Sequence, residues 1–421
     1  MKQKKVIILG GGFAGLQLAR KLNNSSFDVL LIDKLNHHQF QPLFYQVATA
    51  RLEPSNISFP FRKIFQRSKN IQFRLAEVTQ VLSQSNQIKT TEGIYDYDYL
   101  VIATGCRTNF FSNQQISKHA YSMKTTQEAI NIRNEILLSF EKFISSNQEE
   151  KEALLNIIIV GAGPTGVELA GSFAEMKKNI LPKDYPNIDF SGLNITILDG
   201  GKHTLGSMSA ESQHASQKYL EALGVKLKME VVVTAYDGNT ITLKNGETLK
   251  SKNVIWAAGV TGNIIDGIAP ESLTRNRYMV DRFNTIKNYN NIFAVGDVSY
   301  MVTPKYPNGH PQLANVAINQ AKNLAHNLVQ LQKNKSLVEY EYKDLGSMAT
   351  IGKFKAVVDL PKFKFHGLLA WYIWMFLHLM LILSVRNKVL TFMNWTWNFL
   401  MKDSSLRLIF KNPENKKVNQ K

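Results

Sequence analysis

The chain has 421 residues, of which 44% are hydrophobic and 20% are charged, enough for two or three domains with sizeable cores. Its single cysteine, Cys106, excludes an intramolecular disulfide framework and a Cys-x-x-Cys redox pair, and indicates a reducing compartment. The net charge of +17 indicates an anionic partner, either nucleic acid or a membrane surface.

The N-terminal residues predict the start of a dinucleotide-binding fold. Residues 6–9 are a short apolar run that ends in glycines, which predicts a buried strand rather than a signal peptide. A glycine turn at 10–15 leads into a helix that we expect to end near Asn23. Residues 27–32 predict the next strand, and it ends at Asp33, where this fold places the acid that binds a ribose hydroxyl pair.

Residues 37–50 mix aromatic and amide side chains without a clean period. They predict either an ordinary packed loop and helix start or a wall against a flavin ring. We expect His37 and His38 to be structural, because no metal-ligand spacing accompanies them.

An internal repeat of domain size follows. Residues 73–105 and 226–259 both predict short alternating strands with tight turns, and they end in YLVIATG and NVIWAAG. The two segments match in length, and each follows its own glycine turn and acid. Two Rossmann-like units, each with an added antiparallel sheet, are the best account.

The second unit starts from residues 155–171, an apolar run followed by Gly161-Ala-Gly163-Pro-Thr-Gly166. We expect Gly161 to allow the tight turn, Gly163 to let backbone approach a pyrophosphate, and Gly166 to let helix and strand pack closely. The next strand ends at Asp199, which favours NADH over NADPH, although Lys202 tempers that preference. Between the units, Thr125-x-x-Glu128 predicts a capping box at the start of a helix over 125–146.

Two further places carry candidate chemistry. Glu168, at the first turn of the second helix, is either a dipole-stabilised surface acid or a side chain that points toward a nicotinamide. Residues 292–297 predict a buried strand ending in Gly-Asp, whose Asp297 can bind a flavin's ribityl hydroxyls. Residues 312–328 then predict a helix that carries Asn315, Asn319 and Gln320.

The C-terminal segment has a different character. Residues 361–421 hold ten Lys and Arg against two Asp and Glu, so +8 of the net charge lies there. Residues 367–385 carry no formal charge, and as one helix they would extend roughly 28 Å, just short of a bilayer core. The next stretch predicts an amphipathic helix with a polar stripe at positions 387, 391, 394, 398 and 402. With bases on both sides of the apolar run, helices lying in the membrane interface are favoured over a single span or a buried soluble helix.

These motifs, in this order and spacing, resemble those of the type II NADH:quinone oxidoreductases, the non-pumping respiratory NADH dehydrogenases. The resemblance runs to about Arg407 and includes GGGFAGL, FQPLFYQVATA, YDYLVIATG, VGAGPTGVELAG, WAAGV, FAVGD and the tail around AWYIWMFLHL, RNKVL and NWTWNFL. It implies an α/β fold of two Rossmann-like domains, the second inserted in the first, followed by C-terminal amphipathic membrane-anchoring helices. The implied domains are FAD-binding over 1–112 and 263–335, NADH-binding over 113–262, and membrane association over 336–421.

The resemblance also implies the chemistry. NADH gives hydride to FAD, and two electrons pass to a quinone (menaquinone or ubiquinone) without proton pumping. The enzyme is implied to be a homodimer, peripheral on an anionic lipid surface at the cytoplasmic face of the inner membrane. Implied FAD contacts are Gly10, Gly12, Phe13, Ala14, Asp33, Lys34, Gln46, Val78, Thr104, Gly105, Gly296, Asp297 and Ala314. Implied NADH contacts are Gly163, Pro164, Thr165, Glu168, Asp199 and Gly259.

One departure concerns the implied catalytic set, which is Glu168, Asn315 and Asn319. The family commonly has glutamines in an A-Q-x-A-x-Q helix motif, where this chain has Ala314-Asn315-Val-Ala317-Ile-Asn319. Asparagine keeps the amide but is one methylene shorter, so the quinone contacts at these two positions are in doubt.

The competing hypotheses differ in their acceptor. Dithiol reductases and sulfide:quinone oxidoreductases share the fold but need a cysteine pair, and Cys106 lies just after a strand end, where we expect a small packed residue. A soluble NADH-dependent reductase of a ferredoxin-type protein is the enzyme alternative. A redox sensor that uses its nucleotides structurally is the alternative from another class. No nucleic acid is expected, because no reading helix or aromatic-basic motif is present.

Overall fold

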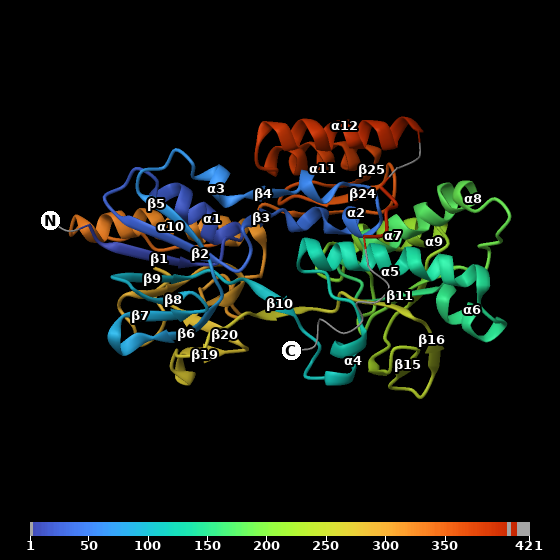
Figure 1. Cartoon of the computed structure of the whole chain (residues 1–421), viewed down its shortest axis with the longest axis horizontal. Helices are drawn as coiled ribbons and strands as arrows, with labels where there is room; N and C mark the ends of the chain where they lie inside the picture. The colour runs from blue at the N-terminus through green and yellow to red at the C-terminus, as the bar shows by residue number, and fades with distance from the viewer. Residues whose placement is uncertain (1–2, 402–405, 411–421) are drawn as a thin grey trace. The chain divides into compact units, whose positions relative to one another are not determined.

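The computed structural model describes residues 3–401 and 406–410 and divides into two compact units, whose segments alternate along the chain (Figure 1). Unit 1 contains the residues up to Gln39, Phe59–Arg107 and Val260–Asp344. Unit 2 contains Phe40–Ser58, Thr108–Gly259 and the residues from Leu345 onward. The domain boundaries expected from the sequence concern binding roles and stay a prediction.

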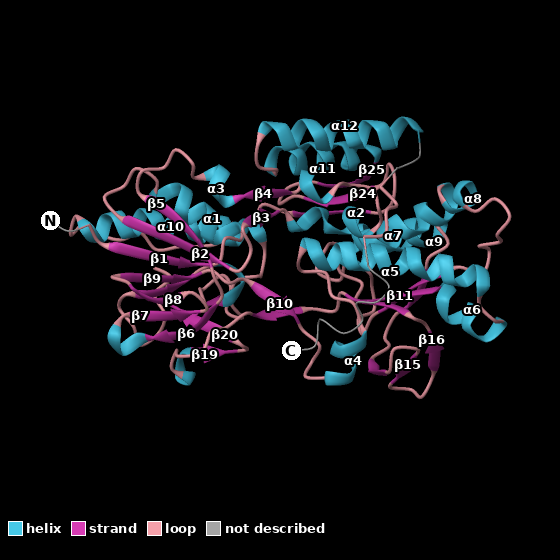
Figure 2. Cartoon of the chain, in the orientation of Figure 1, coloured by secondary structure: helices cyan, strands magenta, loops and turns pink. Residues whose placement is uncertain are grey.

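Unit 1 is organised around a parallel sheet in the order β21-β9-β1-β2-β5 (Figure 2). These strands are Ile292–Ala294, Tyr99–Ile102, Lys5–Leu9, Asp28–Asp33 and Ile71–Leu75. Most of their residues are buried, as the apolar runs predict for a parallel sheet that is covered on both faces. Helix α1 (Phe13–Leu22) packs against α10 (Ala314–Gln332) in the same unit.

The predicted alternating strands of unit 1 are confirmed. They form the antiparallel sheet β6-β7-β8, whose strands are Val78–Leu82, Gln87–Thr90 and Gly93–Asp96. The chain then returns as β9, which pairs parallel to β1. A second small sheet has the order β19-β20-β22, with strands Leu273–Thr274, Arg277–Val280 and Ser299–Met301.

Unit 2 repeats the same plan. Its parallel sheet has the order β13-β12-β11-β17, with strands Lys226–Lys228, Asn194–Leu198, Asn156–Val160 and Asn253–Trp256. Strands β14 (Val233–Tyr236), β15 (Thr240–Leu243) and β16 (Thr248–Lys250) form the antiparallel sheet, and β17 then pairs parallel to β11. The predicted internal repeat is therefore a repeat of topology.

The helices of unit 2 include the predicted capped helix. Helix α5 (Thr126–Ser145) is capped by Thr125, whose hydroxyl accepts from the Glu128 N–H at 3.1 Å while the Glu128 carboxylate accepts from the Thr125 N–H. Helix α7 (Pro164–Asn179) follows the second glycine turn. The remaining helices before the C-terminal region are α2 (Phe44–Ala48), α4 (Gln114–His119), α6 (Gln148–Leu155), α8 (Leu181–Asp184) and α9 (Ala210–Ala222).

Short elements connect these layers. They are β3 (His37–Gln39), η1 (Gln41–Leu43), η2 (Pro54–Asn56), β4 (Ser58–Pro60), α3 (Phe61–Ile64), η3 (Ser83–Ser85), β10 (Cys106–Thr108), β18 (Val260–Gly262), η4 (Pro270–Ser272) and η5 (Gly296–Val298).

The C-terminal region of unit 2 is a three-stranded sheet followed by two helices. The strands β23 (Ser347–Thr350), β24 (Ala356–Asp359) and β25 (Lys364–Gly367) pair antiparallel. The apolar run 367–385, considered above as one helix, is broken: α11 (Leu368–Leu381) ends before Ser384, which has a φ of 69°, and α12 (Val385–Met401) begins beyond it. Within the described ranges 3–401 and 406–410, no helix is both long and apolar enough to cross a bilayer.

Helix α12 is amphipathic as predicted, and its polar stripe faces the protein. Asn387 and Thr391 are buried, and Asn387 donates to the carbonyls of Ser55 and Ser58 at 3.3 Å. Lys402, the last position of the predicted stripe, lies outside the described residues. The large exposed apolar side chains on the helix are Val385, Val389, Phe392, Met393, Trp397, Phe399, Leu400 and Met401. Those on α11 are Leu368, Leu369, Tyr372, Phe376, Leu377, Met380 and Leu381.

Candidate functional site

The glycine turn of unit 1 forms a cradle between β1 and α1. Gly10 has a φ of +98°, and a Cβ there would lie 2.5 Å from the Ala103 oxygen. A Cβ on Gly15 would lie 1.8 Å from the Gly10 oxygen, so this glycine allows close packing of helix and strand. A Cβ on Gly12 would meet no atom within 4 Å, and no side chain caps the start of α1. The start of α1 therefore faces open space at Gly12, and the N-terminus of a helix is where a phosphate group can bind.

Asp33 ends the second strand beside this turn. Its carboxylate accepts from the Gly11 N–H at 2.6 Å and from the Leu35 N–H at 2.7 Å. Burial raises the pKa of Asp33, and the two N–H donors oppose that shift. These two hydrogen bonds therefore hold the carboxylate beside the glycine turn. Lys34 follows it directly in the chain.

The other predicted FAD residues of unit 1 follow strand ends of the same parallel sheet, whose carboxyl ends share one edge. Thr104 and Gly105 follow β9, and the Thr104 hydroxyl donates to the Asn263 carbonyl at 2.6 Å. Asp297 lies in η5 after β21, and its carboxylate accepts from the Cys106 thiol at 3.0 Å. Val78, at the start of β6, is part of the antiparallel sheet instead.

Gln320 supports the turn that holds Gly296 and Asp297. This glutamine is 1% exposed, and its Oε1 accepts from the Gly296 N–H at 2.7 Å and from the Ser299 hydroxyl at 3.2 Å. These two hydrogen bonds from a buried side chain therefore stabilise the turn at Gly296. The sequence placed Gln320 on the right helix but gave no signal for this role, because the partner comes from a strand end far along the chain.

Asn315 and Asn319 lie one turn apart on α10, directly after Ala314 at the helix start. The Asn319 Nδ2 donates to the Asn315 Oδ1 at 3.0 Å. The two amides therefore act on each other in this structure, and their expected quinone contacts stay a prediction.

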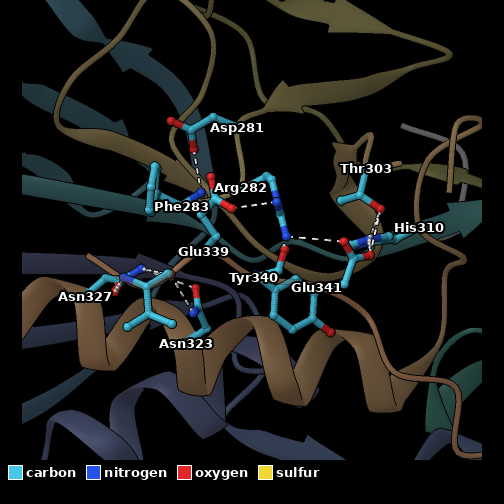
Figure 3. A network of polar contacts seen from close by, with 11 residues as sticks. Asp281, Arg282, Phe283, Thr303, His310, Asn323, Asn327, Glu339, Tyr340 and Glu341 are labelled. Carbon is cyan, nitrogen blue, oxygen red and sulfur yellow. Dashed lines mark hydrogen bonds and ion pairs between the residues drawn. The ribbon is translucent and has the colours of Figure 1, made fainter. Parts of the chain in front are cut away.

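A polar network in unit 1 holds the loop that leads into α10 (Figure 3). Arg282 pairs with Glu339 at 2.5 Å and with Glu341 at 3.2 Å. Glu341 also accepts from the Thr303 hydroxyl at 2.8 Å and lies 3.8 Å from Nε2 of His310, which is almost fully buried. The network ties residues 339–341 to residues 303–310. Two residues later, the Gln312 side chain donates to the Asp297 carbonyl at 3.0 Å.

Unit 2 contains the same cradle. Gly161 has a φ of +114° and packs on Ala257, and a Cβ on Gly166 would lie 1.9 Å from the Gly161 oxygen. Gly163, like Gly12, has open space where its Cβ would be, and it precedes Pro164 and Thr165 in the first turn of α7. All three roles expected for these glycines fit this geometry.

Asp199 matches Asp33 in place and contacts. It directly follows β12, and its carboxylate accepts from the N–H groups of Ala162 and Gly201, each at 2.6 Å. Gly259 follows β17 with a φ of +94°. The predicted NADH residues Gly163, Asp199 and Gly259 therefore lie at strand ends of one parallel sheet, as the FAD residues do in unit 1.

Glu168 lies on α7, one turn beyond this cradle. It is partly buried, and its Oε1 accepts from the Thr350 N–H at 3.4 Å. Burial raises its pKa to about 8, although the Thr350 N–H opposes the shift. A dipole-stabilised surface acid would have a lowered pKa, so the surface-acid interpretation is disfavoured. An acid with a pKa near neutrality can exchange a proton at physiological pH.

Residues 37–50 were predicted as a packed loop or a flavin wall, and the part of this segment from Phe40 onward is packed within unit 2. Phe44, Tyr45 and Gln46 of α2 are buried, and α2 contacts α5 and α7. The Gln46 Nε2 donates to the Tyr45 hydroxyl at 3.0 Å. Its expected contact with FAD stays a prediction.

His38 is a structural residue, as expected. It is buried in unit 1 with its Nδ1 3.0 Å from the Gly11 carbonyl oxygen, and burial lowers its pKa to about 4. The neutral ring therefore braces the glycine turn. Among the described residues no group of three or more His, Cys, Asp or Glu side chains could hold a metal ion.

The two cradles fit two dinucleotides. In each unit, open space lies at the glycine where a pyrophosphate would approach the backbone, a helix starts directly beyond that glycine, and a hydrogen-bonded acid lies at the end of the next strand.

Comparison with known families agrees with this geometry. Residues 4–321 match the model of the family described as pyridine nucleotide-disulphide oxidoreductase, and residues 345–402 match that described as NDH2 C-terminal domain. The type II NADH:quinone oxidoreductase Ndh of Mycobacterium tuberculosis is 33% identical over 95% of this chain and 89% of its own length. The type II NADH:quinone oxidoreductase of Staphylococcus aureus is 28% identical over 84% of this chain and 89% of its own length.

Solved structures share the fold. NDH2 from Plasmodium falciparum in complex with NADH has a TM-score of 0.90 at 22% identity, over 97% of this chain and all of that chain. The sulfide:quinone oxidoreductase from Aquifex aeolicus has a TM-score of 0.72 at 20% identity, over 95% of this chain and 96% of that chain.

Proposed function

We infer that this chain oxidises NADH and reduces a membrane quinone without pumping protons, because it belongs to the pyridine nucleotide-disulphide oxidoreductases. Within that family it belongs to the type II NADH:quinone oxidoreductases. The observation that carries this proposal is the pair of matching cradles, one per unit, in a chain whose single cysteine provides no dithiol. A flavin is then the group that carries the electrons.

FAD binds in unit 1 and NADH binds in unit 2. Bound FAD would supply the redox chemistry, which is uptake of hydride from NADH and transfer of two electrons to the quinone. The turn at Gly12 and the start of α1 hold the flavin's pyrophosphate, and Asp33 holds a ribose hydroxyl pair. The turn at Gly163 and Asp199 do the same for NADH. Asp297, fixed by the Cys106 thiol, binds ribityl hydroxyls.

Glu168 holds or releases a proton near the nicotinamide and quinone. Its partial burial keeps the acid protonated at neutral pH, and the Thr350 N–H stabilises the carboxylate after the proton has left. Quinone reduction consumes protons as well as electrons, so a neutral acid that can lose its proton near pH 8 fits this reaction.

The acceptor is a quinone in the membrane, and the protein associates with an anionic lipid surface through α11 and α12. Helix α12 turns its polar stripe to the protein and leaves Phe392, Trp397 and Leu400 more than half exposed. An apolar face of this kind lies in a lipid interface, and basic residues add attraction to anionic lipid. A soluble reductase of a ferredoxin-type protein would leave this apolar face without a partner.

We propose three further properties. The enzyme is a homodimer, it is peripheral on the cytoplasmic face of the inner membrane, and Asn315 and Asn319 contact the quinone. They rest on the family resemblance and on the position of the two amides at the start of α10. Sedimentation equilibrium and the quinone KM of the Asn315→Gln variant test the first and last of these.

Steady-state kinetics test the proposed reaction. FAD-loaded protein should oxidise NADH rapidly with a water-soluble quinone and slowly without one, and it should sediment with vesicles that contain anionic lipid. Equal rates with and without quinone, for protein of full flavin content, would contradict the proposal. Loss of vesicle binding alone would contradict only the membrane part.

A further inference from the structure

A small cavity in unit 2 is lined by both C-terminal helices. Its volume is about 50 Å³, and its walls include the aromatic side chains Trp371 and Trp374 from α11 and Trp395 and Phe399 from α12, beside polar residues that include Lys353. At roughly 10–15 Å³ for each water-sized group, the cavity has room for three to five such groups. A phosphate group is of that size.

Two donors at this cavity lack acceptors. The residue Trp374 is 2% exposed, and its indole Nε1 has no hydrogen-bond partner. The guanidinium of Arg51, which also lines the cavity and is partly exposed, makes no ion pair or hydrogen bond with another described residue, although the Arg51 carbonyl accepts from Asn398 at 2.8 Å. Buried donors are nearly always paired, so an unpaired indole N–H in a cavity indicates a missing acceptor.

The neighbouring tryptophan shows the contrast. The Nε1 of Trp395 donates to the Gln46 Oε1 at 2.8 Å, so that indole is already satisfied by the protein. The ligand of the cavity must therefore bring oxygen acceptors to Trp374 and Arg51. Arginine favours an anionic oxygen over a neutral carbonyl, because charge-assisted hydrogen bonds are about twice as strong as neutral ones.

The surroundings indicate that the anionic group belongs to an amphiphile. The helices that supply the aromatic walls expose Tyr372, Phe376, Phe392 and Leu400 on their outer sides. A ligand with one phosphate in the cavity and acyl chains along this apolar surface satisfies both features. We propose that the cavity beside Arg51 and Trp374 binds the phosphate of a membrane phospholipid, as a lipid site distinct from general attraction to an anionic surface. This inference rests on the membrane association proposed above.

The test measures binding of a short-chain phosphatidylglycerol, used below its micelle concentration, to the full-length, FAD-loaded protein. Three of the five tryptophans line the cavity, so intrinsic fluorescence reports its occupation. We expect a saturable fluorescence change. Arg51→Gln should weaken the affinity at least tenfold, and Trp374→Phe, which keeps an aromatic ring but removes the N–H donor, should weaken it several-fold.

A matched control is Arg386→Gln. Arg386 is an exposed base on α12 that does not line the cavity, so this variant makes the same charge change and should bind the lipid like the wild type. An unchanged melting temperature and flavin content establish that each variant is folded. Equal affinity of Arg51→Gln and wild type would overturn the proposal.

Two other probes separate the possible sources of the oxygen. Inorganic phosphate that binds as tightly as the lipid would overturn the lipid assignment and make the cavity a free phosphate site. A short-chain quinone that displaces the lipid with the same dependence on Arg51 would overturn it in favour of a quinone site. Vesicle binding and NADH:quinone turnover are measured on the same samples. If vesicle binding and NADH:quinone turnover are lost while the short-chain lipid still binds, the result counts against the proposed function and not against this lipid site.

Discussion

The open space at Gly163 gives a sharp test of the NADH cradle. Its φ is −70°, which any residue adopts, and a Cβ there would meet no atom within 4 Å. Gly163→Ala should therefore change the free energy of unfolding by less than about 1 kcal/mol, in the stabilising direction, because alanine restricts the unfolded chain. The same methyl group stands where a pyrophosphate approaches, so NADH affinity should fall at least tenfold, or about 1.4 kcal/mol.

Gly166→Ala is the matched variant. Its methyl group would lie 1.9 Å from the Gly161 oxygen, so helix or strand must move, at a cost of about 1–3 kcal/mol or more. We expect a melting temperature lower by several degrees, where Gly163→Ala shows no loss. The assays are thermal unfolding, flavin content and the KM for NADH.

Flavin content should be the same in Gly163→Ala and wild type, because FAD is assigned to unit 1. Normal NADH affinity in a folded Gly163→Ala variant would refute the assignment of this turn to the pyrophosphate. If Gly163→Ala were destabilised as much as Gly166→Ala, the conclusion that the Cβ position of Gly163 is empty would be refuted.

Glu168→Gln should change the pH dependence of stability. The pKa of Glu168 in the folded protein, about 8, exceeds the ordinary glutamate value of 4.5, so wild-type stability falls as pH rises between the two values, and the variant should lack that slope in urea unfolding from pH 5 to 9. Glu341→Gln should lower the free energy of unfolding by about 1–3 kcal/mol, because it weakens the pair with Arg282, and a two-probe chemical denaturation would detect it. Replacing the exposed Phe392 and Trp397 together with Gln should leave stability nearly unchanged yet reduce vesicle binding at least a hundredfold, since each side chain contributes about 1.5–3 kcal/mol when buried in an apolar phase. Vesicle binding equal to wild type would remove α12 from the membrane contact.

The elements that carry the two cradles could be predicted because their signals are local. Short stretches of sequence are enough to predict a glycine turn, the strand before it and the acid at the end of the next strand. Gly161, Gly166 and Asp199 all lie where those stretches place them. The capping box at Thr125 is local in the same sense.

Features that depend on distant partners could not be predicted. The sequence indicated a polar stripe on α12, but only the structure reveals that Asn387 turns toward the protein, because its acceptors are the carbonyls of Ser55 and Ser58. The break at Ser384 was missed because an apolar run carries no signal for a single residue with positive φ. The raised pKa of Glu168 depends on burial, which the sequence does not report.

A single-turnover experiment tests the central claim most directly. Flavin absorbance is followed in a stopped-flow instrument without oxygen, first as NADH is mixed with FAD-loaded protein and then as a short-chain quinone is added. The account predicts rapid bleaching by NADH and rapid recovery with one equivalent of quinone for each flavin. A flavin that NADH reduces but no quinone reoxidises would contradict it, and would indicate a different electron acceptor.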